Sequence, residues 1–462
     1  MGAMLPPAKP AAPAARPSRR PADPPGTAAR RAAMRLLDAV LRRGEPLEAA
    51  LATATRGLEG SDRGLAHAIA AEALRRLPDL DALIDSATRQ RLPDDAKART
   101  ALRIALVQTL ALGTPGHAAI ATVLPLVDGG PRKLVHGVFG ALSRGGATLP
   151  DVPALPADVA ERWREAWGDE VVAAAGVAIA APPPLDLTLR APAGAGAELQ
   201  AADQEASSST IQAYDAGAWP SPGYEGVSLA PAHLRLHEHG HIADLPGYAD
   251  GAWWVQDLAA SIPARLIGDG PGTALDLCAA PGGKTMQLAA AGWQTIALEI
   301  SPARAARLHE NLARTKLGAK VVIADALDWA PAAPIDALLL DAPCSATGIF
   351  RRHPDVLYRA HPGIVADMAA LQAKLLARAA DWVRPGGQLV YATCSLEREE
   401  GEEQLARFLA ARGDYAVEPV RADELPEGIA PHPNGHVRTL PGTLADQGGC
   451  DGFFIVRLVR QQ

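Results

Sequence analysis

Two cysteines stand where a thiol could take part in chemistry, because each follows a short apolar run. Cys344 comes after residues 337–340 and Asp341, and Cys394 comes after residues 388–393. A lone cysteine is most often a small buried hydrophobe, whereas a thiolate whose pKa is lowered by a cation or a helix N-terminus is a strong nucleophile. Since neighbouring parallel strands bring their carboxyl ends together, we expect Cys344 and Cys394 to share one site.

A glycine turn supplies the second group of candidate residues. Residues 273–285 read T-A-L-D-L-C-A-A-P-G-G-K-T, which predicts a strand, a turn at 281–283 and a helix. Such a turn points backbone N–H groups at a polar or anionic ligand. A Walker loop needs glycine at the position of Cys278, and a nicotinamide fingerprint needs three spaced glycines, so neither motif fits. Cys278 itself is a compact residue that suits packing within the turn. Lys284 is a candidate cation near the thiols, although packing or substrate contact would explain it equally well.

Acidic residues end four successive apolar strands of the same region, at the edge where such sheets bind ligands. The predicted strands finish in Asp276, Glu299, Asp325 and Asp341. Glu299 lies about 20 residues after the first acid, where doubly wound folds hydrogen-bond a ribose diol. One acid alone would be explained by strand-end or helix-cap preference, but four beside a glycine turn favour a nucleoside-like cofactor.

Helical periods alternate with apolar strands throughout the last part of the chain, from residue 251 onwards. The further elements are helices at 258–267, 364–383 and 397–409 and strands at 388–393 and 452–459. This order predicts a mostly parallel α/β sheet.

The first third of the chain has a different composition. Residues 1–28 are rich in Pro, Ala and Arg, and we interpret them as a disordered tail rather than a transit peptide. Residues 29–144 have helical periodicity, clearest at 31–41, 66–77 and 100–112. Residues 1–144 hold 21 Lys and Arg against 13 Asp and Glu, while the remainder holds 24 against 39. A basic helical module on an acidic body favours nucleic-acid contact, with a solvated helical face as the alternative.

The middle of the chain, residues 145–250, is predicted to be a linker and a small mixed subdomain. A helix is expected at 162–181, closed by three prolines, and a strand at 185–190. Histidines cluster in the last part, at His233, His237, His239 and His241. Alternate histidines could bind a metal, but no acidic or apolar residues frame them, so we expect a solvated hairpin without metal.

Composition argues against several further classes of protein. The four cysteines include no C-x-x-C pair, which excludes a zinc ribbon, argues against a disulfide scaffold and fits the cytoplasm. Cys450 has no partner that we can name from the sequence. No apolar run reaches the length of a membrane span, since residues 171–181 are short and end at prolines.

Three motifs, D-L-C-A-A-P-G-G-K-T, D-A-P-C-S-A-T-G and A-T-C-S, together resemble those of the S-adenosylmethionine-dependent RNA cytosine-5 methyltransferases of the NOL1/NOP2/Sun family. The helical region is similar to the NusB-like RNA-binding domain of a bacterial member of that family, on residues 63–75, 106–108, 117–119 and 139–144. The likeness covers nearly the whole chain after the tail. It implies an N-terminal all-α NusB-like domain (29–145), a small α+β linker subdomain (146–250) and an α/β Rossmann-like S-adenosylmethionine-dependent methyltransferase domain (251–462).

The resemblance also implies a role for each candidate residue. Cys394 would attack C6 of a cytosine that has left its stack, C5 would take the methyl group, and Cys344 would assist product release. Asp341 would hydrogen-bond the cytosine edge and border the cofactor, Glu299 would bind the ribose and Asp325 the adenine. The methionine portion of S-adenosyl-L-methionine would lie against Cys278, Ala279, Ala280, Pro281, Gly282, Gly283 and Lys284.

The substrate implied by the resemblance is RNA, first of all 16S ribosomal RNA, and the chain is expected to act as a cytoplasmic monomer without metal or membrane. Three alternatives stay open. A methyltransferase acting on transfer RNA or protein would use the same core. An amino-group methyltransferase would need no thiol and would carry an aromatic residue where Cys344 stands, and a non-catalytic assembly factor would keep cofactor affinity alone.

Overall fold

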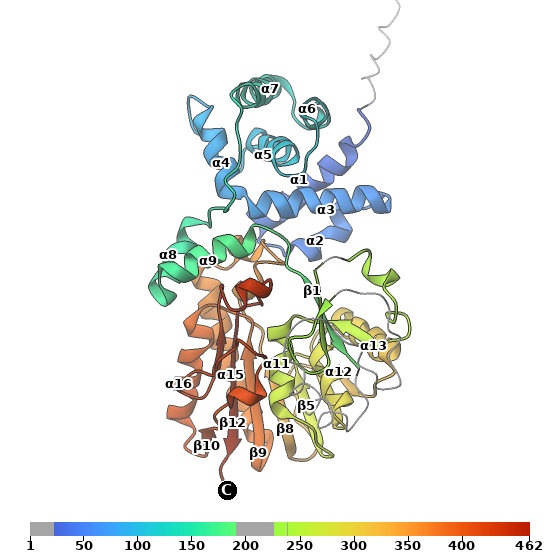
Figure 1. Cartoon of the computed structure of the whole chain (residues 1–462), viewed down its shortest axis with the longest axis vertical. Helices are drawn as coiled ribbons and strands as arrows, with labels where there is room; N and C mark the ends of the chain where they lie inside the picture. The colour runs from blue at the N-terminus through green and yellow to red at the C-terminus, as the bar shows by residue number, and fades with distance from the viewer. Residues whose placement is uncertain (1–22, 191–225, 238) are drawn as a thin grey trace, which may run out of the picture.

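The computed structural model describes residues 23–190, 226–237 and 239–462, which form a helical domain and a larger α/β domain (Figure 1). Of the predicted tail, residues 1–22 lie outside the described part, and the first helix already begins at Thr27. Residues 191–225 of the predicted linker also lie outside it. Within the described ranges, no helix is both long enough and apolar enough to pass through a membrane.

A bundle of α-helices around one apolar core forms the helical domain. Its helices are α1 (Thr27–Arg43), α2 (Leu47–Ala54), α3 (Gly60–Arg75), α4 (Leu77–Ser86), α5 (Lys97–Leu110), α6 (Gly116–Val123) and α7 (Gly129–Arg144), with the 3-10 turn η1 (Leu124–Leu126). The helical period buries Leu37 and Val40 of α1 and Ile69 of α3 in the same core. The helix predicted at 66–77 is divided, because α3 ends at Arg75 and α4 starts afresh with Pro78 in its first turn.

Part of the positive charge of this domain is buried inside it. Arg99 and Arg103 are buried and form ion pairs with Asp81 and Asp85, with N–O distances of 2.7 to 3.1 Å. Arg30 is also buried and donates to the side chain of Gln108 at 2.7 Å. Because these guanidinium groups are used within the domain, its number of basic residues overstates the number of positive groups that a nucleic acid could meet.

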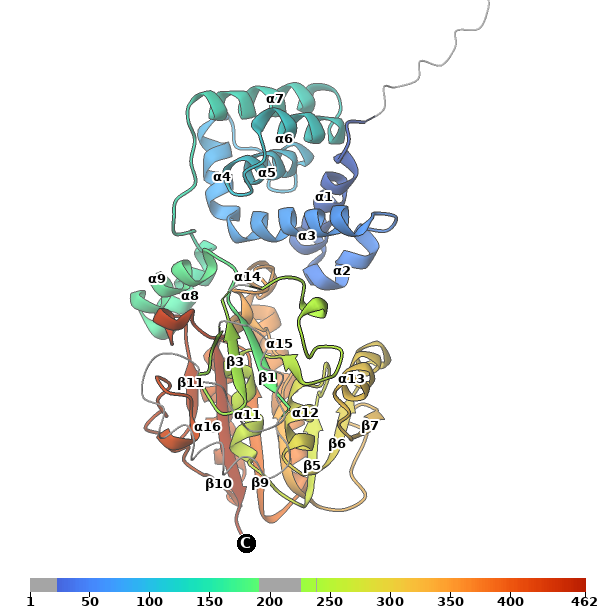
Figure 2. The same ribbon diagram turned by 45° about the vertical axis from the view of Figure 1, so that its right-hand side comes forward.

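Helices α8 (Ala157–Trp167) and α9 (Asp169–Ile179) lie between the two domains in both views (Figure 2). The continuous helix predicted over 162–181 is wrong, because Gly168 adopts φ 86° and separates two shorter helices. Trp163 of α8 packs against Phe350, with ring centroids 5.4 Å apart, and its Nε1 donates to Glu397 at 3.2 Å. These helices therefore rest on the segments that follow the two predicted catalytic cysteines.

A small antiparallel sheet follows, with strand order β2-β3-β1-β4. Its strands are β1 (Leu185–Leu189), β2 (Gly226–Val227), β3 (His233–Leu236) and β4 (Trp253–Val255), with the 3-10 turn η2 (Ile242–Asp244) between the last two. β4 pairs with β1, so this subdomain extends beyond the boundary predicted at 250. The solvated hairpin predicted for the histidines is wrong for His233, which is buried on β3 at 3.4 Å from Asp186. His237, His239 and His241 are exposed.

The α/β domain is built on a sheet with strand order β10-β12-β9-β8-β5-β6-β7, in which the five strands from β9 to β7 run parallel. The strands are β5 (Thr273–Leu277), β6 (Gln294–Glu299), β7 (Lys320–Ile323), β8 (Ile335–Asp341), β9 (Val383–Thr393), β10 (Tyr415–Val417), β11 (Val437–Thr439, paired with β12) and β12 (Phe453–Arg460). This arrangement confirms the predicted Rossmann-like fold, with antiparallel strands added at the β9 edge.

Helices cover both faces of this sheet. α11 (Leu258–Ile267), α12 (Gly283–Ala290) and α13 (Pro302–Thr315) lie on one face, and α15 (Pro362–Trp382) and α16 (Glu402–Ala411) on the other. Short turns complete the domain: η3 (Thr347–Ile349), α14 (Val356–Arg359), η4 (Arg398–Glu400), η5 (Ala422–Glu424) and η6 (Ala445–Gln447). The sheet is thus buried on both sides, and its carboxyl edge is the part left for a ligand.

Two of the four predicted strand ends differ from the observed ones. Asp276 lies inside β5 and is buried, because the strand continues one residue further. β7 ends at Ile323, so Asp325 lies in the turn after it. Glu299 and Asp341 are the last residues of β6 and β8, as predicted.

The helical domain docks on the segment that follows Cys344. The short helix α14 contacts α1, and the hydroxyl of Tyr358 donates to the carbonyl oxygen of Leu74 at 2.7 Å. Arg75, at the end of α3, donates to the carbonyl oxygen of Arg351 at 3.1 Å. The position of the helical domain is therefore tied to the loop of one predicted catalytic cysteine.

Candidate active site

The two predicted cysteines lie side by side, with 3.4 Å between Cys344 Sγ and Cys394 Sγ. Their strands, β8 and β9, are parallel neighbours, so both cysteines leave the sheet at the same edge. Two backbone hydrogen bonds join the loops beyond the strands: Ala342 N–H donates to Ala392 O at 2.9 Å, and Gly348 N–H donates to Cys394 O at 3.0 Å. The sequence prediction that these thiols share one site is confirmed.

The thiol pair differs from the other cysteines in its surroundings. The hydrogen bond to Cys394, together with burial, raises the pKa of the Cys344 thiol well above its usual value, so Cys344 carries its proton at neutral pH. Burial raises the pKa of Cys278 to about 12, which agrees with the packing role predicted for it. Cys450 is buried near the end of the chain and its pKa is also raised by burial.

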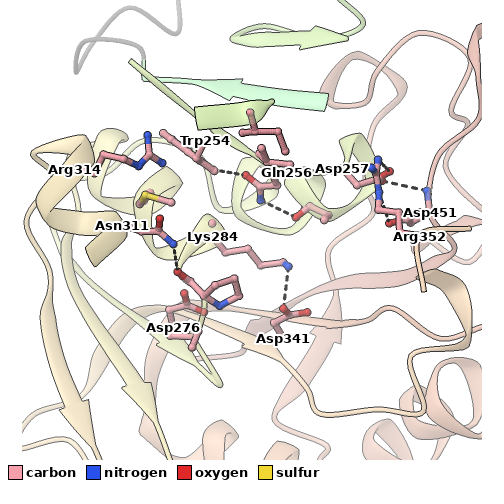
Figure 3. Close-up of a pocket in the computed structure, with 18 of the residues that line it drawn as sticks. Trp254, Gln256, Asp257, Asp276, Lys284, Asn311, Arg314, Asp341, Arg352 and Asp451 are labelled. Carbon is pink, nitrogen blue, oxygen red and sulfur yellow. Dashed lines mark hydrogen bonds and ion pairs between the residues drawn. The ribbon is translucent and has the colours of Figure 1, made fainter. Parts of the chain in front are cut away.

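Lys284 and Asp341 form an ion pair close to the thiols, with 2.9 Å between Nζ and Oδ2 (Figure 3). Burial opposes the charge of the Lys284 ammonium, but the Asp341 carboxylate outweighs that effect and keeps the pKa of Lys284 above its usual value. The ring of Phe453 lies 5.5 Å from Nζ and adds a cation–π contact. The predicted cation is therefore present, and it is held between a carboxylate and an aromatic face.

The glycine turn has the shape of a ligand cradle. Gly282 adopts φ 107°, and a Cβ there would meet Leu308 Cδ1 at 2.4 Å, so a side chain is excluded for two reasons. Gly283 begins α12, whose first backbone N–H groups face the carboxyl edge of the sheet. The turn therefore brings backbone rather than side chains to the ligand.

Asp276 provides a test of whether a cationic ligand fits beside this turn. Its Oδ2 accepts a hydrogen bond from Thr285 Oγ1 at 2.6 Å, while its buried Oδ1 has no partner among the described residues. Burial raises the pKa of Asp276 to about 7. An ammonium group such as that of S-adenosyl-L-methionine would supply the missing donor, so the residues present fit this cofactor.

The two acids predicted to bind the nucleoside part lie further along the same edge. Glu299 is buried, accepts Ala280 N–H at 3.3 Å and forms an ion pair with the exposed Arg304 at 3.3 Å. Asp325 accepts Leu327 N–H at 2.8 Å in the turn after β7. Glu299 is thus connected directly to the glycine turn, whereas Asp325 stands one strand away.

Two apolar residues at this edge were not predicted from the sequence. Ile300 is 61% exposed and Ile323 is 51% exposed, which is unusual for isoleucine. They adjoin Glu299 and Asp325, and β6 and β7 are paired so that Glu299 lies opposite Ile323. In the sequence, Ile300 directly follows Glu299, and Ile323 precedes Asp325 by two residues. This spacing could have indicated an apolar surface beside the two acids, of the kind that contacts the face of a base.

A cavity of about 390 Å³ opens between the glycine turn, Asp341 and β4 (Figure 3). Its further lining includes Trp254 on β4 and Gln256 directly after it, Asn311 and Arg314 on α13, and Arg352 and Asp451. Asn311 donates to Pro281 O at 2.9 Å, which fixes one wall to the glycine turn. Sequence reasoning missed these residues because they come from separate segments. The described residues contain no cluster of His, Cys, Asp and Glu suited to a metal ion.

A Rossmann-like sheet with a glycine cradle, strand-end acids and an orphaned carboxylate oxygen defines an S-adenosylmethionine-dependent methyltransferase. Comparison with known families agrees. Residues 269–459 match the family described as 16S rRNA methyltransferase RsmB/F, and residues 27–139 match the NusB family.

Similar proteins extend over nearly the whole chain. Ribosomal RNA small subunit methyltransferase B of Xylella fastidiosa strain Temecula1 is 36% identical over 452 residues, which covers 94% of this chain and 98% of that protein. The protein of the same name from Pseudomonas syringae pv. tomato is 32% identical, covering 93% of this chain and 96% of that one. This chain belongs to the RsmB/F family of methyltransferases.

Solved structures support the same fold. The crystal structure of PH0851 covers 94% of this chain and 99% of its own, with a TM-score of 0.66 and 21% identity. NSun6 from Pyrococcus horikoshii, solved with SFG, covers 67% of this chain and 99% of its own, with a TM-score of 0.53 and 18% identity.

Proposed function

We propose that this enzyme transfers a methyl group to C5 of a cytidine in 16S ribosomal RNA, through a transient bond between Cys394 Sγ and C6 of the base. The observation that carries this proposal is the thiol pair, 3.4 Å apart at the carboxyl edge of the sheet and close to Lys284 and Asp341. Methylation of an exocyclic nitrogen needs no thiol, so the pair favours carbon methylation over that alternative.

The two thiols have different parts in this reaction. C5 of cytosine is a weak nucleophile, and addition of the Cys394 thiolate to C6 turns C5 into an enamine carbon that can take the methyl group. Loss of the proton from C5 to solvent then breaks the bond between Cys394 Sγ and C6, and the bonding electrons leave with the sulfur as the Cys394 thiolate. Cys344, which remains a thiol because its pKa is raised, assists this release by donating a hydrogen bond to the departing sulfur.

Asp341 and Lys284 hold the base in the proposed complex. Oδ2 of Asp341 is occupied by Lys284, and the side chain is 30% exposed, so Oδ1 is available for the edge of the cytosine. A carboxylate at that edge stabilises the protonated ring that addition to C6 requires. A base can reach this position only after leaving its stack.

The cofactor residues divide by the part of S-adenosyl-L-methionine that they would hold. Residues 278–284 and Asp276 would bind the methionine portion, Glu299 the ribose and Asp325 the adenine, whose faces would lie against Ile300 and Ile323. When bound, the cofactor supplies a sulfonium-activated methyl group. The chain's own contribution would be to hold the cofactor and the base that Cys394 activates in the same site.

The names of the relatives and the NusB-family domain support small-subunit ribosomal RNA as the substrate. The helical domain would bind that RNA, and it sits on α14, close to the Cys344 loop. We further propose that a single chain acts in the cytoplasm, where this RNA is assembled into ribosomes.

Bisulfite mapping of ribosomal RNA from cells lacking the protein tests the proposal, with transfer RNA mapped in parallel. We expect one 16S cytidine to lose its methyl group, and to regain it with the native protein but not with Cys394→Ala. Loss of a transfer-RNA methyl group instead, or rescue by Cys394→Ala, would contradict it.

A further inference from the structure

A serine follows each cysteine of the active site, and both serines bind one buried glutamate. Ser345 N–H donates to Glu400 Oε1 at 2.8 Å, and the hydroxyl of Ser345 donates to Oε2. The hydroxyl of Ser395 also donates to Oε2, at 2.5 Å. Glu400 therefore connects the loop that follows Cys344 with the loop that follows Cys394.

The environment of Glu400 is unusual for a carboxylate. The residue is fully buried, and its remaining hydrogen bond comes from Gln372 Nε2, at 2.9 Å from Oε1. All of these donors are neutral, and burial raises the pKa of the carboxyl group. A buried carboxylate bound only by neutral groups is costly to retain, and it persists where its hydrogen bonds fix a particular arrangement.

The backbone around Glu400 is held by side chains of the sheet and of a helix. The hydroxyl of Tyr391, on β9, donates to Glu400 O at 2.8 Å. Gln372, on α15, also donates to Pro343 O at 2.9 Å, directly before Cys344. Glu400 is thus fixed to the sheet and to a long helix, so its side chain can hold both loops in a defined position.

The bridge adds side-chain contacts to the strand pairing and the backbone hydrogen bonds that already bring the two cysteines together. Ser345 Oγ and Ser395 Oγ lie 3.1 Å apart because both contact the same carboxylate, and the preceding cysteines are 3.4 Å apart. The hydrogen bond with Cys394 and burial are the main causes of the raised pKa of Cys344, and the Glu400 carboxylate adds to them.

We propose that Glu400 is a positioning residue that holds Cys344 and Cys394 at contact distance through Ser345 and Ser395. Its role in the reaction rests on the proposed function, because contact between the thiols matters for release of Cys394 from the base. Glu400 itself does not touch the substrate.

Disulfide formation measures the separation of the thiols without any RNA. In the full-length protein, diamide oxidises two thiols to a disulfide and takes up their two electrons and two protons, and the sulfurs must approach to about 2.05 Å. We expect the Cys344–Cys394 disulfide, followed by mass spectrometry of peptides, to form about ten times more slowly in Ser345→Ala and Ser395→Ala, because a buried hydrogen bond to a charged group is lost. In Glu400→Gln the slowing should be smaller, because loss of the carboxylate also lowers the pKa of Cys344. Ser345→Ala and Ser395→Ala retain the carboxylate, so they test the proposal even if Glu400→Gln does not fold.

Glu424→Gln provides the matched control, since Glu424 is a largely buried carboxylate of the same domain that binds Arg457 and neither cysteine loop. It should leave the rate of disulfide formation unchanged. In the enzymatic reaction, Ser345→Ala should lower kcat with little change in KM and increase the fraction of protein found bound to RNA on a denaturing gel.

Native rates of disulfide formation in Glu400→Gln and the serine variants, or an equal loss in Glu424→Gln, would overturn the positioning role. A native protein that forms the disulfide rapidly but methylates no cytidine would instead contradict the proposed function and leave the positioning role standing.

Discussion

A buried ion-pair cluster in the helical domain and two buried carboxylates in the α/β domain differ in how their charges are matched. In the helical domain, the buried guanidinium of Arg99 is matched by the carboxylates of Asp81 and Asp85. In the α/β domain, Asp276 beside the glycine turn keeps one buried oxygen without a partner in the described part of the chain, and Glu400 beside the cysteine loops is bound by neutral donors alone.

We infer that the ion pairs of the helical domain stabilise its fold, whereas the two carboxylates of the α/β domain belong to the active site. Ion pairs within the bundle fix how its helices pack. Removal of either partner leaves the other charge unpaired inside the protein, which is destabilising. Buried carboxylates that lack a cation or a full set of hydrogen-bond donors lower the stability of a protein. Proteins retain them where a ligand or a reacting group supplies the missing partner. The predictions below test whether stability and activity divide between the two regions in this way.

The largest effect is expected at Asp341. Asp341→Asn keeps the size of the side chain but removes the charge that would stabilise the protonated cytosine, so kcat should fall by about 10²- to 10⁴-fold. The change also leaves the buried ammonium of Lys284 without its carboxylate, so the melting temperature should fall as well, and kcat is measured at a temperature where the variant is folded. A variant with near-native turnover would remove Asp341 from the reaction.

In the helical domain we expect a loss of stability without a loss of cofactor affinity. Arg99→Met leaves Asp85 without its buried cation, while Asp81 keeps Arg103, and should lower the free energy of unfolding by about 3 kcal/mol. Cofactor affinity, measured by calorimetry on the folded protein, should stay native. A loss of cofactor affinity with unchanged stability would show that the two regions are not divided as described.

Asp276 makes cofactor binding dependent on pH. Burial raises its pKa to about 7, and the ammonium group of the cofactor should bind the ionised form. Affinity should therefore level off above pH 7 and fall by about tenfold for each pH unit below it. Calorimetry in buffers of different ionisation enthalpy should detect proton release near pH 7. Asp276→Asn should flatten the profile, and an unchanged profile in that variant would assign the pH dependence to another group.

The smallest effect concerns the exposed charges of the helical domain. Arg132 and Lys133 are exposed at the start of α7, and changing both to Ala should reduce the salt dependence of RNA binding by a slope of about 1 to 2. Arg42→Ala is the control, because Arg42 is already paired with Asp38. Equal effects of the two changes would show that α7 does not face the RNA.

The parts of the site that could be predicted from the sequence depend on short continuous segments or on a general rule of strand order. The strand, glycine turn and helix around Cys278 to Lys284 follow within one short segment, so their arrangement could be predicted. Cys344 and Cys394 are 50 residues apart, yet the rule that parallel strands end at one edge was sufficient to place them together.

The missed features depend on contacts between distant segments. Glu400 follows Cys394 closely, but its partners Ser345 and Gln372 lie on other elements, and nothing in the local pattern indicates them. The burial of His233 results from pairing of β3 with β1. The break at Gly168 was missed because the helical pattern continues across it, although only a glycine adopts that conformation easily.

The central claim is that Cys394 bonds to a cytosine and Cys344 releases it, and a denaturing gel of Cys344→Ala with 16S ribosomal RNA and S-adenosyl-L-methionine tests it most directly. The account predicts a slowly migrating protein–RNA band in Cys344→Ala that is absent from Cys394→Ala and from the double variant. Continued turnover in Cys394→Ala, or a band of equal intensity in both single variants, would contradict it.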